Sequence, residues 1–136
     1  MSRLNDKVVL ITAGADGIGL AVARRLSAEG AKVTISDINS EAVKEIAENE
    51  GWHGIYHDAG SEEDWRRVMD EIKDRYGRLD VLVNNAGIGQ APGDIESQSL
   101  EAYHNVLRVS LDSVFIGSKL AIEIMKDKGG AIINMS

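Results

Sequence analysis

The stretch KVVLITAGADGIG, residues 7–19, predicts the fold of this chain more clearly than any other part of the sequence. Residues 7–12 form a short apolar run rich in β-branched side chains, which is typical of a buried strand. A glycine-rich loop follows, and Ile18, Val22 and Leu26 then recur at helical spacing. A strand that passes through such a loop directly into a helix indicates the first half of a βαβ unit.

Strands and helices keep alternating beyond this stretch. Further strands are predicted at residues 32–36, 54–57, 79–84 and 131–135, and helices at 17–29, at 40–49, from Ser61 onward and at about 99–126. Ser40 and Ser61 are the predicted N-caps of the second and third helices. This order predicts a doubly wound α/β fold in one domain, residues 1–136. Its parallel sheet has five strands in the order 3-2-1-4-5, with helices on both faces. Ligands bind such sheets at the carboxyl ends of the strands.

Composition excludes several classes of protein. The 136 residues carry a net charge of −7, which argues against a surface for nucleic acid or anionic membrane. There is no cysteine, and the three histidines show no metal-ligand spacing, so we expect no disulfide and no metal site. No apolar run reaches the length of a membrane span, and Asp6 and Lys7 interrupt the N-terminus too early for a secretion signal. We therefore expect a cytoplasmic protein without nucleic-acid or membrane partners.

The loop after the first predicted strand is a candidate phosphate site. Gly14, Gly17 and Gly19 let backbone amides approach a pyrophosphate, and the N-terminus of the following helix adds positive potential. The loop lacks the spacing G-x-G-x-x-G, however. An ordinary tight turn between strand and helix is the alternative that the loop alone leaves open.

Three motifs in order along the chain resemble the short-chain dehydrogenase/reductase family. Thr12-x4-Gly17-Ile18-Gly19 is similar to the family's T-G-x3-G-I-G fingerprint, and Asn84-Asn85-Ala86-Gly87 matches its N-N-A-G motif after the fourth strand. Residues 129–136 (GGAIINMS) resemble its fifth strand. The resemblance implies a Rossmann-like fold, NAD(H) as partner, and a full-length parent that interconverts secondary alcohols and ketones by hydride transfer. This chain then corresponds to the N-terminal NAD-binding portion, with the C-terminal strands of the family absent.

The resemblance also implies which residues bind the cofactor. Asp58 stands where the family has the acid that contacts the adenine amino group. The whole expected set lies at the ends of four predicted strands: Thr12, Gly14, Asp16, Gly17, Ile18, Gly19, Asp37, Ile38, Asp58, Ala59, Asn85, Ala86 and Gly87.

Asp37 favours NAD over NADP as the cofactor. It ends the second predicted strand, 18 residues beyond Gly19, close to the spacing expected for an acid on the adenosine ribose. A carboxylate there accepts hydrogen bonds from the ribose hydroxyls and repels a 2′-phosphate. NADP-preferring relatives carry a basic residue near the glycine loop or after this strand, where this chain has Asp16 and Ile38. The alternative interpretation of Asp37 is a turn residue that caps the next helix.

Two positions depart from the family pattern. Ala13 replaces the first fingerprint glycine, and we expect it to keep a negative φ while Gly14 absorbs the strain. Because the charge of Asp16 also lies near the cofactor phosphates, we expect weaker binding than the fold permits. Ser110 occupies the position of a catalytic Asn that helps to position a water in proton relay, and the shorter serine is expected to impair that relay. Alternatively, Ser110 bonds only its own helix backbone.

The family's catalytic Tyr-x3-Lys pair has no counterpart in this chain. Tyr56, Tyr76 and Tyr103 are each followed four positions later by a residue other than lysine. The chemistry needs a tyrosine acidified by a nearby cation, so we expect no turnover from this chain alone and no catalytic residue besides Ser110. The alternatives to an NAD-dependent oxidoreductase are a catalytically inactive dinucleotide-binding module and a folding fragment.

The predicted helix at 99–126 carries two apolar stripes, where packing on a sheet needs only one. The first stripe is Leu100, Tyr103, Leu107, Leu111, Val114 and Ile122, and the second is Val106, Val109, Ile116, Leu120 and Ile124. We expect a homo-oligomer through this helix (residues 100–126), with the second stripe at the contact. The alternative is a helix buried deep within one domain.

Overall fold

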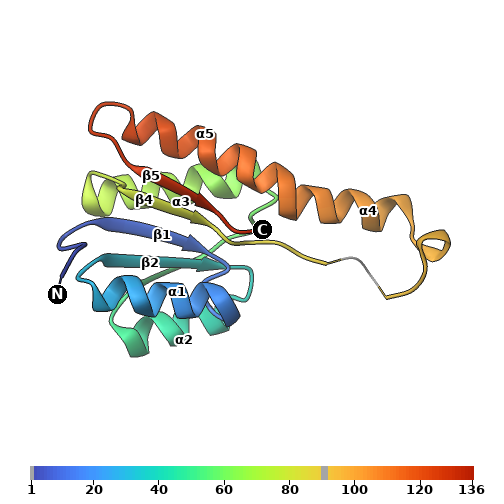
Figure 1. Cartoon of the computed structure of the whole chain (residues 1–136), viewed down its shortest axis with the longest axis horizontal. Helices are drawn as coiled ribbons and strands as arrows, with labels where there is room; N and C mark the ends of the chain where they lie inside the picture. Colours follow the sequence, from blue (N-terminus) through green and yellow to red (C-terminus); the bar gives the residue numbers. More distant parts are fainter. Residues whose placement is uncertain (1, 90–91) are drawn as a thin grey trace.

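The sheet has the predicted topology. The structure, a computed structural model, describes residues 2–89 and 92–136. Its five parallel strands are β1 (Val8–Thr12), β2 (Lys32–Asp37), β3 (His53–Tyr56), β4 (Val81–Asn84) and β5 (Ala131–Asn134). They are ordered β3-β2-β1-β4-β5 (Figure 1), which confirms the predicted fold class and strand order.

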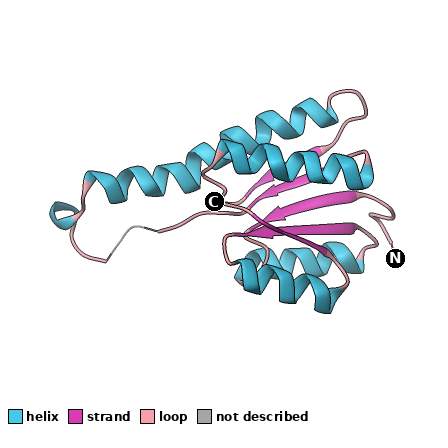
Figure 2. Cartoon of the chain, turned by 180° about the vertical axis from the view of Figure 1, so that it is seen from behind, coloured by secondary structure: helices cyan, strands magenta, loops and turns pink. Residues whose placement is uncertain are grey.

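Helices cover both faces of this sheet. Figures 1 and 2 show α1 (Gly17–Ala28) and α2 (Ser40–Glu50) on one side, with α3 (Glu62–Tyr76) and α5 (Ser113–Met125) on the other. Successive strand residues point to opposite faces, so β1 contributes to two cores. Val9 and Ile11 pack with the α1–α2 side, whereas Val8 and Leu10 pack with the α3–α5 side.

The predicted helix at 99–126 consists of three segments. After a short 3₁₀ turn (Ile95–Ser97), α4 spans Leu100–Leu107, a π-helical segment spans Arg108–Asp112, and α5 follows. The three continue one another, and α4 extends beyond the sheet (Figure 1). A π-helix closes its hydrogen bonds over one more residue than an α-helix, and such segments are frequent at functional sites.

The prediction that the second apolar stripe makes the subunit contact is wrong. Leu120 is only 4% exposed, and Ile116 and Ile124 pack against the core between α3 and α5. The α5 part of this stripe is covered because α5 uses it to pack on its own sheet and on α3. The outward surface instead carries Leu100, Tyr103, Leu111, Phe115 and Ile122, four of which the sequence placed in the first stripe.

Helix ends agree with the predictions in part. Ser61 caps α3 as predicted, accepting a hydrogen bond from the Asp64 amide at 3.2 Å. The N-cap of α2 is Asn39, whose side chain accepts from the Ala42 amide at 3.0 Å, whereas the sequence suggested Ser40. Among the described residues, no helix has the length and apolar character needed to cross a bilayer.

Candidate functional site

A cavity of about 200 Å³ opens at the carboxyl ends of the strands. Its walls come from the ends of β1 and β2, from the loops after β3 and β4, and from the junction of α4 with the π-helical segment. Seven of the predicted cofactor residues line it: Thr12, Asp37, Ile38, Asp58, Ala59, Ala86 and Gly87. The other six, Gly14, Asp16, Gly17, Ile18, Gly19 and Asn85, lie in or beside the adjoining glycine loop.

The glycine loop is held tightly against the ends of β1 and β4. Thr12 Oγ1 accepts hydrogen bonds from the Asn85 and Ala86 amides, both at 2.9 Å. The Asn85 side-chain amide donates to the carbonyl oxygens of Thr12 and Ala13 at 3.2 and 3.3 Å. A Cβ at Gly19 would lie 2.5 Å from Asn85 Nδ2 and still closer to the Ala13 oxygen. Only glycine therefore fits at position 19.

Ala13 adopts the left-handed backbone conformation that we expected at Gly14. Its φ is +51°, in the left-handed region, whereas Gly14 is not among the positive-φ residues. The expectation of a negative φ at Ala13 is therefore wrong. Gly14 serves packing instead, because a Cβ there would lie 2.6 Å from Ile35 Cγ2 on β2. The loop thus places a residue with a Cβ where the backbone favours glycine.

Ala13→Gly should therefore stabilise the fold. Glycine adopts positive φ without the steric penalty of a Cβ, so we expect the free energy of unfolding in urea to rise by about 1 kcal/mol. Ala15→Gly is the matched control: Ala15 is buried and has no positive φ, so the same change should destabilise. A loss of stability in Ala13→Gly equal to that in Ala15→Gly would contradict strain at residue 13.

Two carboxylates are engaged with the backbone of the loop. Asp37 Oδ2 accepts from the Ala15 amide at 3.1 Å, and Oδ1 accepts from the Asn39 amide at 3.0 Å. Asp37 thus fixes the turn after β2 and lines the cavity. It does not cap the next helix, because the N-cap of α2 is Asn39. Asp16 is the N-cap of α1, and its Oδ1 accepts from the Gly17 amide at 2.8 Å. Both carboxylates therefore have defined positions.

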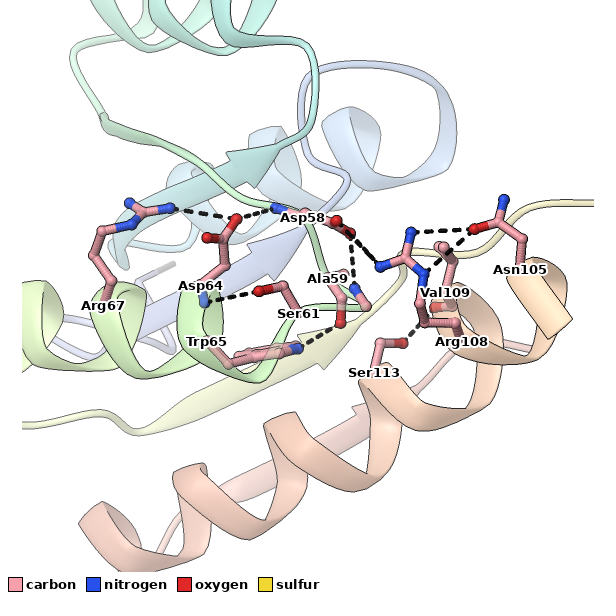
Figure 3. Close-up of polar contacts among 11 residues, drawn as sticks. Asp58, Ala59, Ser61, Asp64, Trp65, Arg67, Asn105, Arg108, Val109 and Ser113 are labelled. Carbon is pink, nitrogen blue, oxygen red and sulfur yellow. Dashed lines mark hydrogen bonds and ion pairs between the residues drawn. The ribbon is translucent and has the colours of Figure 1, made fainter. Parts of the chain in front are cut away.

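Asp58 is paired with a cation that the sequence analysis missed (Figure 3). Arg108 Nη1 lies 3.1 Å from each Asp58 oxygen, and the Gly60 amide donates to Oδ1 at 3.0 Å. Behind this pair, the Asp58 amide donates to Asp64 Oδ2 at 2.7 Å. No motif marks Arg108, because 50 residues separate it from Asp58.

His57 is a buried residue on the cavity wall. It is 3% exposed, and its Nδ1 lies 2.8 Å from Ser36 Oγ. Its ring packs edge-on against the Trp65 ring, with 4.4 Å between the ring centroids. Its Nε2 has no hydrogen-bond partner among residues 2–89 and 92–136. Burial lowers the pKa of His57 to about 4, so the ring is neutral at pH 7. No sequence motif marks His57 as a site residue.

Ser110 does not bond its own helix, which corrects that alternative. Its Oγ accepts from the Ile88 amide at 3.1 Å and donates to the Ile88 carbonyl at 3.2 Å. Ser113, in contrast, does bond within the helix, donating to the Val109 carbonyl at 2.5 Å. Ser110 therefore braces the loop after β4 from the π-helical segment.

Comparison with known proteins agrees with this geometry. The model for the short chain dehydrogenase family matches residues 7–136. The chain belongs to this family. It is 47% identical over 137 residues to 3-beta-hydroxysteroid dehydrogenase of Comamonas testosteroni, covering 99% of this chain and 54% of that protein. It is 39% identical to the NADP-dependent (R)-specific alcohol dehydrogenase of Lentilactobacillus kefiri, covering 98% of this chain and 55% of that protein.

A solved structure leads to the same family. A short chain dehydrogenase from Mycobacterium smegmatis superimposes with a TM-score of 0.91 at 36% identity, covering 98% of this chain and 58% of that one. The chain therefore spans just over half the length of the short chain dehydrogenases that it matches.

Proposed function

We propose that this chain supplies the cofactor-binding half of an NAD-dependent oxidoreductase that interconverts secondary alcohols and ketones. The observation that carries the proposal is the cavity at the strand ends, next to a glycine loop too crowded for a Cβ at Gly19. It lies where the strand order reverses between β1 and β4, which is where doubly wound sheets bind dinucleotides. When bound, the nicotinamide would accept or donate the hydride.

The site residues suit a dinucleotide chemically. The loop from Ala13 to Gly19 leads into the N-terminus of α1, whose backbone N–H groups favour phosphate. Asp37 and Asp58 offer acceptors at the cavity wall for hydroxyl and amino groups. We propose these two, together with the other predicted cofactor residues, as the binding set. The names of the relatives, a hydroxysteroid dehydrogenase and an alcohol dehydrogenase, support a secondary alcohol as substrate class.

The choice between NAD and NADP rests on local residues. One relative is NADP-dependent at 39% identity, so family membership does not decide it. In this chain Asp37 holds its carboxylate at the cavity wall, fixed by the Ala15 and Asn39 amides. A fixed negative charge disfavours a 2′-phosphate, and Ile38 beside it offers no cation. We therefore propose NAD as the preferred cofactor.

Calorimetric titration with NAD and with NADP tests this choice. The unmodified chain should bind NAD more tightly than NADP. Asp37→Asn should reduce the ratio of the two affinities about tenfold, because it removes the charge at nearly constant size. Asp37→Ala should narrow it too, with added loosening of the turn. Asp74→Ala, an exposed carboxylate on α3, is the control and should leave the ratio unchanged. NADP binding as tight as NAD in the unmodified chain would refute the role of Asp37.

The chain should also self-associate through the outward surface of α4, the π-helical segment and α5. Leu111 and Phe115 are 60% and 68% exposed there, so Phe115→Lys should shift sedimentation at low micromolar concentration from dimer to monomer. Ile95→Lys is the control, because Ile95 is 89% exposed but lies before α4. A monomeric unmodified chain would contradict this expectation, and a dimer insensitive to Phe115→Lys would place the contact elsewhere.

A further inference from the structure

Arg108 has a defined position at the cavity wall (Figure 3). Its Nη1 contacts both oxygens of Asp58, while Nε and Nη2 donate to Asn105 Oδ1 at 3.3 and 3.1 Å. The guanidinium also fills the space beside Gly60, where a Cβ would lie 2.7 Å from Arg108 Cζ. Asn105 behind it and Gly60 beside it therefore hold the guanidinium against Asp58.

The pair presents a donor next to an acceptor. A guanidinium has five N–H donors and no acceptor, and the four contacts above occupy at most four of them. Asp58 Oδ1 also receives the Gly60 amide, so Oδ2 is the oxygen with more acceptor capacity left. Side-chain exposure of 39% for Arg108 and 26% for Asp58 leaves both accessible from the cavity. A ligand therefore meets both polarities side by side.

The two common forms of the purine six-membered ring present opposite patterns. Adenine offers an amino donor beside an acceptor nitrogen, whereas hypoxanthine offers an oxo acceptor beside an N–H donor. A lone carboxylate suits the amino group and repels the oxo group. A carboxylate with a guanidinium beside it can satisfy either edge.

We propose that Arg108 sets the base specificity of the site: with Asp58 it lets the cavity accept an oxo-purine dinucleotide almost as well as NAD. This inference rests on the proposed dinucleotide function. Arg108 acts as a specificity-determining residue, and the segment that carries it, Arg108–Asp112, is the π-helical one.

Titration calorimetry with NAD and with nicotinamide hypoxanthine dinucleotide tests the proposal on the whole 136-residue chain. The affinities of the unmodified chain for the two dinucleotides should lie within about threefold of each other, because either base edge finds a donor in Arg108 and an acceptor in Asp58. Arg108→Met keeps the apolar stem beside Gly60 but removes every donor. It should weaken the hypoxanthine dinucleotide about tenfold relative to NAD. Arg108→Lys keeps a donor and should stay close to the unmodified ratio.

Two further variants separate recognition from folding. Arg66→Met breaks an exposed ion pair with Glu62 on α3, which does not line the cavity, and should leave the ratio unchanged. Asp58→Asn should shift the ratio toward the hypoxanthine dinucleotide by several-fold, because the acceptor charge is lost. The ratio is the decisive readout, since a merely structural role for Arg108 would weaken both ligands equally.

The outcomes are distinguishable. If the unmodified chain binds neither dinucleotide, the proposed function fails and this inference fails with it. If NAD binds but Arg108→Met leaves the ratio of the two affinities unchanged, only the role of Arg108 is overturned. If the unmodified chain bound NAD well over tenfold more tightly than the hypoxanthine dinucleotide, the role of Arg108 would also be overturned.

Discussion

The free energy of unfolding is expected to fall by about 2 kcal/mol between pH 6.5 and pH 4.5 because of one buried histidine, His57. Burial lowers its pKa from 6.5 to about 4 in the folded chain. In this window the unfolded chain therefore binds a proton that the folded chain does not. A pKa depression of this size contributes roughly 3 kcal/mol to the free energy of unfolding. This contribution is fully present above the pKa of the unfolded chain and is lost as the pH falls toward the pKa of the folded chain.

The charges near His57 partly oppose one another. Asp64 and Asp58 raise its pKa and Arg67 lowers it, so burial against Trp65 and Ser36 dominates. His53 also has a pKa lowered by burial, and Glu29, whose pKa is held low by hydrogen bonds from Arg3, contributes at lower pH. Between pH 6.5 and pH 4.5 the loss of stability therefore comes mainly from the histidines.

Urea unfolding followed across this window measures the effect. His57→Gln retains a side chain able to hydrogen bond to Ser36 but cannot be charged, so its stability should change much less with pH. His53→Gln is the matched control and should remove only a small part of the pH dependence of the free energy of unfolding. The assignment fails if His57→Gln keeps the full loss of stability.

Gly19→Ala is expected to have the second large effect. The added methyl group would overlap the Ala13 oxygen and lie 2.5 Å from Asn85 Nδ2. Both belong to the contact that joins the glycine loop to the loop after β4, so the backbone must shift. Overpacking of this kind costs about 1–3 kcal/mol, and we expect NAD affinity to fall at least tenfold because the displaced loop is the proposed phosphate cradle.

Gly17→Ala is the matched comparison. A Cβ at Gly17 would meet nothing within 4 Å, although its φ of +54° adds strain. We therefore expect a stability loss of about 1 kcal/mol and a smaller loss of affinity. Titration calorimetry and urea unfolding on both variants measure the difference. Equal losses in the two variants would show that crowding at residue 19 is not the cause.

Local patterns were enough to predict the sheet. The apolar run at 7–12 and its successors specify buried parallel strands, and the observed strand ends differ from the predicted ones by at most two residues. The loop motifs located the cavity for a related reason, since they all follow strand ends that the topology gathers at one edge.

The features that the sequence did not predict depend on contacts between distant segments. Arg108 meets Asp58 across 50 residues, and no local pattern encodes that distance. The burial of His57 depends on Trp65 from α3 and Ser36 from β2. The left-handed conformation was assigned to Gly14 instead of Ala13, because the sequence does not show that Gly14 is a glycine for another reason, its close packing against Ile35. The covered stripe was misjudged because periodicity marks an apolar face without identifying its neighbour.

The π-helical segment makes one wall of the cavity depend on the number of residues in the chain as well as on their identity. A regular helix turns by about 100° per residue. A π turn holds one residue more than an α turn, so a loss inside Arg108–Asp112 can be absorbed by closing that turn. If instead one residue were lost from α5 before Leu120, with Leu120 and Ala121 fixed on the sheet, the preceding residues would rotate by about a quarter turn. Arg108 would then leave Asp58, and Ser110 would leave Ile88, without any substitution at those positions. In this family member, a single insertion or deletion in that helix can alter the cavity wall as much as a change of side chain.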